Sequence, residues 1–235
     1  MLAIENLIVE FDGKIALNLD RLAIKEGEKI AVVGRSGSGK STLIHHIYEL
    51  MRPQAALCSQ RQGLVENLSV FHNIFMGGLQ RHNWLYNLVN LAYPLQKNRH
   101  AITLITNDLE LDCTINQTVI HLSGGQRQRV ALARSLYQYQ DVFIGDEPFS
   151  ALDPAMGRRL LGHVLQQHKT VIMVLHDSNM ALEYFDRVIG LHDGNKVFDA
   201  YCKDINSNIF QDLYQQVSQD KKDTTPAPFA NSVSR

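Results

Sequence analysis

One short glycine- and serine-rich stretch, residues 34–42, constrains the fold of this chain more than any other part of it. It reads Gly-Arg-Ser-Gly-Ser-Gly-Lys-Ser-Thr. A glycine, four residues and then Gly-Lys-Ser is the pattern of a loop that binds phosphate groups. The apolar run 29–33 before it favours a β-strand, and apolar residues at helical spacing from Leu43 to Met51 follow it. The stretch therefore predicts a nucleotide-phosphate site between a strand and a helix; the alternative is an ordinary Gly/Ser turn.

The physical reason lies in the backbone of such a loop. Its glycines let successive N–H groups converge on an anion, and the following helix adds the positive end of its dipole. Lys40 can reach the β- and γ-phosphates of ATP, and the Ser41 hydroxyl can ligate Mg²⁺. The residues predicted to bind the nucleotide here are Gly34, Arg35, Ser36, Gly37, Ser38, Gly39, Lys40, Ser41 and Thr42.

Composition narrows the class of protein. The 235 residues are 45% hydrophobic, enough for one large domain or for a core with a smaller insertion. A formal net charge of −1 offers no strong positive field, so nucleic acid is not an expected partner. The three cysteines share no metal-ligand spacing and indicate reduced thiols in the cytosol. No apolar run reaches membrane-spanning length, so we expect any role at a membrane to require a partner.

Strand-like and helix-like segments alternate along most of the chain. Strand-like runs at 2–11, 29–33, 55–59, 141–146 and 170–175 are separated by helical patterns. This order predicts an α/β fold with a mostly parallel sheet wrapped by helices. Residues 61–122 show helical spacing and no convincing strand, which indicates an inserted helical subdomain. We expect one domain over 1–217, with a last helix at 205–217, and a disordered polar tail at 218–235.

Two acids close a buried strand. Asp146 ends the apolar run Val-Phe-Ile-Gly, and Glu147 follows it directly. An acid at this place in phosphate-loop enzymes holds Mg²⁺, and a neighbouring carboxylate can polarise the attacking water. We therefore predict Asp146 as a metal residue and Glu147 as the catalytic base. Two exposed acids at the start of a loop are the alternative.

A second small anion site is predicted where Leu-Ser-Gly-Gly-Gln precedes a helix. A serine hydroxyl and glycine amides at a helix N-terminus can bind an anion, here through Ser123, Gly124, Gly125 and Gln126. With the phosphate loop before it and Asp146 after it, the whole chain resembles the ATP-binding subunit of an ABC transporter. The family's motifs occur in order from Phe11 to His176, and the resemblance covers nearly the whole chain except the tail. It implies a P-loop NTPase core, ATP and Mg²⁺ as cofactors, and ATP hydrolysis.

That resemblance implies roles for four further residues. Phe11 would stack on adenine, although a core residue at a strand end is the alternative. Gln60 would contact Mg²⁺ and the attacking water, and His176 would contact the γ-phosphate. Asp153 would belong to a loop that reaches across a dimer, and it can also cap the helix that begins at Pro154.

The resemblance also implies partners. The family works as a head-to-tail dimer in which each ATP lies between the phosphate loop of one subunit and the Ser123–Gln126 segment of the other. An integral membrane permease would be the other partner, with a solute-binding protein as a further one. The chain would then lie in the cytoplasm, on the inner face of the membrane.

The chain departs from the family between Lys40 and Gln60, which are only 20 positions apart. Strands that normally form part of an antiparallel β-subdomain have no residues to form them, so we expect that subdomain to be reduced. Because those strands flank the nucleotide rather than ligate it, the departure bears on the edge of the sheet more than on the chemistry.

The solute is the least determined property. Residues 62–77 and 204–214 resemble the corresponding segments of phosphonate importer ATPases, which favours import of phosphonate or a related oxyanion. The alternatives are the ATPase of an exporter or lipoprotein-extracting complex, and a non-transport ABC protein that uses ATP as a clamp. A binding module without hydrolysis is disfavoured because Lys40, Asp146, Glu147 and His176 are all present.

Overall fold

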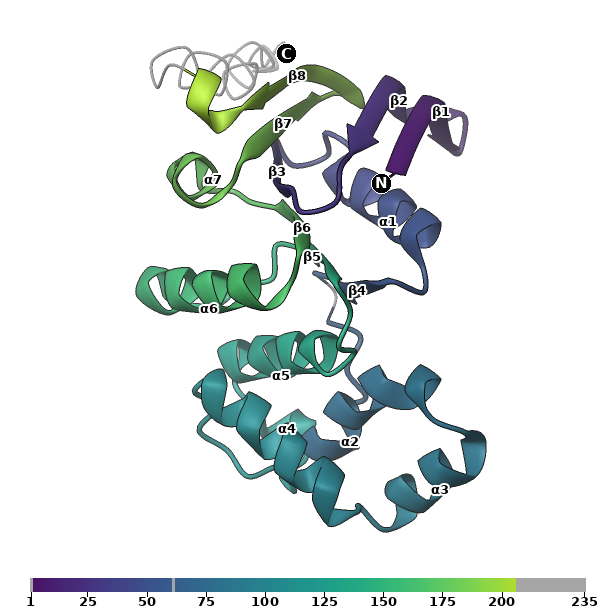
Figure 1. Cartoon of the computed structure of the whole chain (residues 1–235), viewed down its shortest axis with the longest axis vertical. Coiled ribbons are helices and arrows are strands. Elements are labelled where there is room, and N and C mark those ends of the chain that lie inside the picture. Colours follow the sequence, from purple (N-terminus) through teal and green to yellow (C-terminus); the bar gives the residue numbers. More distant parts are fainter. Residues whose placement is uncertain (1, 61, 206–235) are drawn as a thin grey trace, which may run out of the picture.

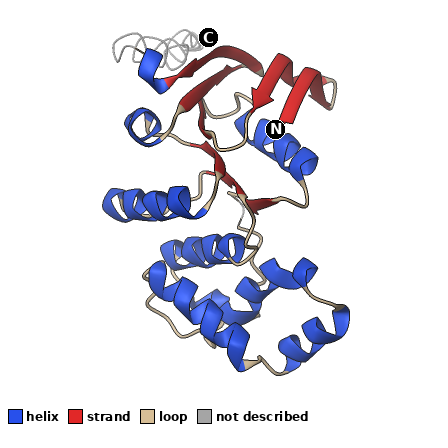
Figure 2. Ribbon diagram, viewed as in Figure 1, coloured by secondary structure: helices blue, strands red, loops and turns tan. Residues whose placement is uncertain are grey.

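The computed structural model describes residues 2–60 and 62–205, and it contains one mixed eight-stranded sheet (Figures 1 and 2). The strand order is β1-β2-β8-β7-β3-β6-β5-β4. The strands are β1 (Leu2–Phe11), β2 (Lys14–Ile24), β3 (Lys29–Gly34), β4 (Ala55–Cys58), β5 (Val142–Asp146), β6 (Thr170–Val174), β7 (Arg187–His192) and β8 (Asn195–Tyr201). Only the β1–β2 and β7–β8 pairs are antiparallel, which confirms the predicted α/β fold with a mostly parallel sheet.

The central strands are buried on both faces, and their alternating side chains supply two separate cores. Ala31 and Val33 of β3 pack into one hydrophobic cluster, while Ile30 and Val32 pack into the other. Successive side chains of a strand point to opposite faces, so an uninterrupted apolar run can fill both cores. This explains why the strand that leads into the phosphate loop has no polar residue after Lys29.

The helices cover the two faces unequally. One face is covered by α1 (Lys40–Met51) together with β1 and β2, and the other by the three helices α5, α6 and α7. The longer helices on that second face are α5 (Gly124–Leu136) and α6 (Pro154–Gln167); α7 (Ser178–Tyr184) is shorter. In Figure 1 the helices of residues 70–108 lie beyond α5, away from the sheet. α5 is therefore the element that joins the sheet to these helices.

Within the described part of the predicted insertion, residues 62–122 form helices and no strand longer than a single bridge, between Ser69 and Thr118. The elements are α2 (Val70–Phe75), the 3₁₀ turn η1 (Met76–Arg81), α3 (Trp84–Ala92), α4 (Gln96–Asp108) and the 3₁₀ turn η2 (Val119–His121). Phe71 and Phe75 belong to the same cluster as Phe143 of the sheet. That residues 61–122 form a separate subdomain stays a prediction. The extent of the whole domain, residues 1–217, also stays a prediction.

The sequence also predicts two turns, a hairpin at Asp193-Gly194 and a tight turn at 26–28 that joins strands at 22–25 and 29–33. The Asp193–Gly194 pair forms the β7–β8 turn with both residues at positive φ, 44° and 79°, as a tight hairpin requires. A short turn also joins β2 and β3, as predicted, and the two strands do not pair with each other, because β8 and β7 lie between them. The helix predicted at 205–217 and the tail at 218–235 lie, apart from Ile205, outside the described residues.

The short segment between Lys40 and Gln60 contains α1, residues 52–54 and β4, and nothing else. The β1–β2 hairpin, with β1 at the edge of the sheet, is the antiparallel part that remains. A final 3₁₀ turn, η3 (Cys202–Asp204), follows β8. Among the described residues, no helix is both long and apolar enough to cross a bilayer.

Candidate nucleotide site

The predicted phosphate loop lies between β3 and α1, as expected from the flanking patterns. Two of its glycines occupy positions that a side chain cannot share. A Cβ at Gly34 would lie 2.3 Å from the backbone oxygen of Leu191, and a Cβ at Gly39, whose φ is 95°, would lie 2.7 Å from that of Ala16. The loop is thus packed against β2 and the end of β7.

The turn between β7 and β8 holds the loop from the outside. The Gly194 N–H donates to the backbone oxygen of Ser38 at 3.2 Å, and the Asn18 N–H donates to the backbone oxygen of Gly194 at 2.7 Å. These bonds link the loop to segments that are far from it along the chain. They hold the backbone of the phosphate loop in place, which keeps its N–H groups oriented to bind an anion.

Lys40 is 5% exposed and lies inside the loop. Its Nζ donates to the backbone oxygens of Gly34, at 2.9 Å, and Arg35, at 2.7 Å. Burial lowers the pKa of Lys40, while the charges of Glu147 and Asp146 act in the opposite direction. An ammonium has three N–H donors, so one remains for a phosphate oxygen.

Asp146 ends β5 at the bottom of the site and is 2% exposed. Burial raises the pKa of its carboxyl; a hydrogen bond from Ser41 opposes that rise, and the Glu147 charge adds to it. The Oδ1 atom is buried and has no hydrogen-bond partner among the described residues. A buried carboxylate oxygen without a donor is costly, so this place in the site favours a cation.

The carboxylate of Glu147 lies between Gln60 and His176. Gln60 Nε2 donates to Oε2 at 3.1 Å, and His176 Nε2 lies 2.6 Å from Oε1. The Glu147 side chain is 11% exposed, whereas that of His176 is 56% exposed. The three residues predicted to carry catalysis come from β4, β5 and β6 ends, and the parallel sheet brings them together at one edge.

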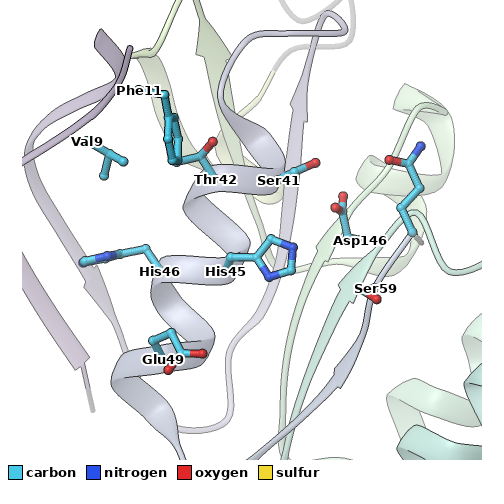
Figure 3. Close-up of a pocket in the computed structure, with 10 residues that line it drawn as sticks. Val9, Phe11, Ser41, Thr42, His45, His46, Glu49, Ser59 and Asp146 are labelled. Atoms are coloured by element: carbon cyan, nitrogen blue, oxygen red, sulfur yellow. The ribbon is translucent and has the colours of Figure 1, made fainter. Parts of the chain in front are cut away.

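A cavity of about 840 Å³ opens beside the loop (Figure 3). Its lining residues are Val9, Phe11, Ser41, Thr42, His45, His46, Glu49, Ser59, Gln60 and Asp146. Phe11 is 60% exposed and lies near Thr42 in Figure 3, so the alternative that it is a core residue is wrong. A second cavity of about 250 Å³ is lined by loop residues together with Gln60, Glu147 and His176.

The remaining predicted residues lie elsewhere. Neither of these two cavities is lined by Ser123, Gly124, Gly125, Gln126 or Asp153. Ser123 and Gln126 form a reciprocal cap at the start of α5, and Asp153 Oδ1 accepts from the Met156 N–H at 3.0 Å at the start of α6. Capping by Asp153 is confirmed, and a role across a dimer stays a prediction.

A residue that no sequence motif pointed to contacts the loop that begins at Glu147. The buried side-chain amide of Gln128 in α5 donates to the backbone oxygen of Glu147 at 3.1 Å. A glutamine within a helix carries no sequence signal that separates a buried position from a solvent-facing one. Only the packing of α5 against the loop reveals it.

A phosphate loop, a strand-end acid pair and a parallel sheet define a phosphate-loop nucleotide-binding protein. Comparison with known families is more specific, because a family model described as "ABC transporter" matches residues 17–150. The chain therefore belongs to the ABC transporter ATP-binding family, whose activity is ATP hydrolysis.

Individual relatives agree with that assignment. The phosphonates import ATP-binding protein PhnC 2 of Rhodopseudomonas palustris strain BisB18 is 32% identical, over 97% of this chain and 94% of that protein. The PhnC 1 protein of Nostoc sp. is 30% identical, over 92% of this chain and 93% of that protein. The solved dimeric structure of the bacterial cassette MJ0796 matches with a TM-score of 0.74 at 25% identity, covering 87% of this chain and all of that chain.

Proposed function

We propose that this chain uses Glu147 as the base of Mg²⁺-dependent ATP hydrolysis, within a head-to-tail dimer that drives solute import through a membrane permease. The observation that supports the catalytic part best is the Glu147 carboxylate, which Gln60 contacts through one oxygen and His176 through the other. A carboxylate held from two sides has little freedom to turn away from an attacking water. Such preorganisation is what general-base catalysis requires.

Lys40 and the loop amides bind the triphosphate in this proposal. Lys40 lines the same small cavity as Glu147 and His176. It would stabilise the charge that develops on the transferred phosphoryl group. Phe11 would stack on the base, for which its exposed position beside Thr42 is suited.

Asp146, Ser41 and Gln60 are the residues proposed to hold Mg²⁺. The buried, unpartnered Oδ1 of Asp146 and the adjacent Ser41 hydroxyl offer oxygen ligands, which Mg²⁺ prefers. Few protein ligands are needed, because Mg²⁺ is usually bound by one or two carboxylates together with substrate phosphates and waters. When bound, the ion neutralises charge on the β- and γ-phosphates.

The dimer and the permease account for the parts of the site that one chain leaves exposed. Ser123 and Gly124 are exposed to solvent and do not line the cavities beside the phosphate loop. In a head-to-tail dimer they would meet the nucleotide of the partner, and the similar MJ0796 cassette is described as dimeric. The helices within 62–122 would contact the permease on the cytoplasmic side of the membrane.

The proposed solute is phosphonate or a related oxyanion. Several relatives are named as phosphonate import proteins. They are 30–32% identical to this chain, and the matches span 87–99% of its length. The solute does not contact this subunit in such a transporter, so the support comes from relatedness and from no residue of the site. Uptake of radiolabelled phosphonates by cells with and without the gene would test it, and unchanged uptake would contradict it.

Glu147→Gln tests the catalytic proposal. The variant keeps the shape of the side chain, removes the base and relieves repulsion with the triphosphate. Hydrolysis should nearly stop while ATP still binds, and the variant should accumulate as a dimer in Mg²⁺-ATP and dissociate in ADP. A phosphate-release assay, with light scattering during gel filtration, measures both effects.

The two readouts separate the two parts of the proposal. Wild-type turnover in Glu147→Gln would remove Glu147 from the catalytic role. Lost turnover without an ATP-dependent dimer would leave the base in place but contradict the shared site.

A further inference from the structure

The backbone of Glu147 has an unusual conformation that something must hold. Its φ is 52°, in the left-handed region that residues other than glycine rarely occupy. Such conformations persist when surrounding contacts determine them, and they gather at functional sites. The contacts that hold the peptide of Glu147 therefore decide where its carboxylate points.

Gln128 supplies one of the two hydrogen bonds to the Glu147 backbone oxygen among the described residues, and two further bonds to the same loop. Its Nε2 donates to the backbone oxygen of Glu147 at 3.1 Å and to Ser150 Oγ at 3.2 Å. Its Oε1 accepts from the Ala151 N–H at 2.7 Å. The one remaining contact to the same Glu147 oxygen is longer, from the Ser150 N–H at 3.3 Å.

The three bonds use both ends of the amide. The Ala151 N–H needs an acceptor and the Glu147 oxygen needs a donor, so only a side chain that carries both can satisfy this loop. Gln128 is 4% exposed. Removal of its amide would take away the acceptor of the Ala151 N–H and leave the Glu147 oxygen with only the longer bond from Ser150.

The position of Gln128 in α5 gives these bonds a second meaning. α5 begins with the Ser123–Gln126 cap, and Gly125 packs against the same loop, where a Cβ would lie 3.4 Å from the Ala151 backbone oxygen. Further along α5, Arg134 donates to the backbone oxygens of Gln62 and, at 2.7 Å, Gly63, just after Gln60. One helix thus contacts both the loop that carries Glu147 and the segment that directly follows Gln60.

We infer that Gln128 is a positioning residue for hydrolysis, which sets the left-handed backbone of Glu147 and so aims its carboxylate between Gln60 and His176. The inference rests on the proposed role of Glu147 as the base. Gln128 itself lines neither of the two cavities beside the phosphate loop. Its effect on turnover passes through Glu147 alone.

Gln128→Met tests this, since methionine has similar length and no amide. We expect kcat to fall on the order of 10²-fold, the size of effect known for small misplacements of a catalytic group. ATP affinity, measured by titration with a slowly hydrolysed analogue, should stay unchanged; the lost hydrogen bonds should lower the melting temperature relative to Gln166→Leu, so kcat is measured well below the melting temperature of either variant. Gln166 is exposed on α6 and serves as the matched control.

A double-mutant cycle separates positioning from general packing. In the Glu147→Gln background, Gln128→Met should change the residual turnover by less than about twofold, because residues that act as a unit are not additive. Additive losses, an unchanged kcat in the single variant, or a fall in ATP affinity equal to the fall in kcat would each overturn the inference. Wild-type turnover in Glu147→Gln alone would instead contradict the role of Glu147 itself.

If Gln128→Met does not fold, Gln128→Glu provides the same test. The carboxylate keeps an acceptor for the Ala151 N–H but cannot donate to the Glu147 oxygen. The expected result is again a low kcat with unchanged ATP affinity. Wild-type kcat in this variant would show that the donor to Glu147 is dispensable and would overturn the inference.

Discussion

The phosphate loop and the Ser123–Gln126 segment both place glycines at the N-terminus of a helix, yet they differ in what satisfies the helix. α1 starts at a left-handed Gly39 and has no side-chain cap. α5 has a full capping box, in which Ser123 Oγ accepts from the Gln126 N–H at 3.3 Å and Gln126 Oε1 accepts from the Ser123 N–H at 2.9 Å. The first helix keeps its N–H groups for a ligand, and the second satisfies its own.

The phosphate loop is also more deeply buried than the start of the Ser123–Gln126 segment. Lys40 and Ser38 are 5% and 2% exposed and lie in a loop packed against β2 and the β7–β8 turn, whereas Ser123 is exposed. The phosphate loop is therefore complete within one chain. The Ser123–Gln126 segment is exposed and satisfies its own cap, so it is stable without a second subunit. On binding a phosphate, the Ser123 hydroxyl would have to share or exchange its cap bond.

Of the changes that test this comparison, Lys40→Ala should lower kcat most, because it removes the charge inside the preformed phosphate loop. Loss of one group that stabilises developing charge costs about 10²–10³-fold in kcat. Phosphate release measures this, with Lys169→Ala as control, since Lys169 is 62% exposed. Turnover within about threefold of wild type would mean that the loop does not depend on its lysine.

The matched pair Gly39→Ala and Gly124→Ala compares the two loops directly. A side chain at Gly39 adopts a left-handed φ and collides with Ala16, so we expect about 1–3 kcal/mol lower stability and loss of ATP binding. A Cβ at Gly124 meets no described atom within 4 Å, and the change should alter stability by no more than about 1 kcal/mol. Urea denaturation gives both values. Equal destabilisation by the two changes would show that the loops are built alike.

Phe11→Ala tests whether Phe11, at the edge of the cavity beside the phosphate loop, contributes to ATP binding. Stacking of a base on an aromatic ring is worth about 1–3 kcal/mol, so ATP should bind more weakly by that amount. Ile8→Ala is the control, because Ile8 is equally exposed on β1 and does not line the cavity beside the loop. Calorimetric titration that finds the same ATP affinity in both variants would contradict stacking.

Ser123→Ala should have the smallest effect on one chain. Loss of an N-cap costs about 1 kcal/mol of stability, and ATP binding by the single subunit should not change. In the Glu147→Gln background the ATP-dependent dimer should weaken. Ser69→Ala removes the cap of α2 and is the matched control, with a similar loss of stability. A dimer that tolerates Ser123→Ala as well as Ser69→Ala would remove Ser123 from the shared site.

Several parts of the site are predictable from local sequence because their physics is local. The glycine spacing of the phosphate loop, the apolar run that ends at Asp146 and the Asp193–Gly194 turn each depend on a few neighbouring residues. Phe11 is a different case. A strand-end aromatic fits a core and a ligand surface equally well, and its 60% exposure depends on which strands surround β1.

What the sequence by itself determined is the phosphate-loop and strand-end acid motifs, together with the α/β class, because motif spacing and hydrophobic periodicity are properties of short segments. Only the tertiary structure decided that β8 and β7 separate β2 from β3, that the β7–β8 turn holds the loop, and that Gln128 holds Glu147. These contacts join residues far apart in the chain. Long-range pairing is selected by burial and hydrogen-bond satisfaction across the whole sheet, which no local window contains.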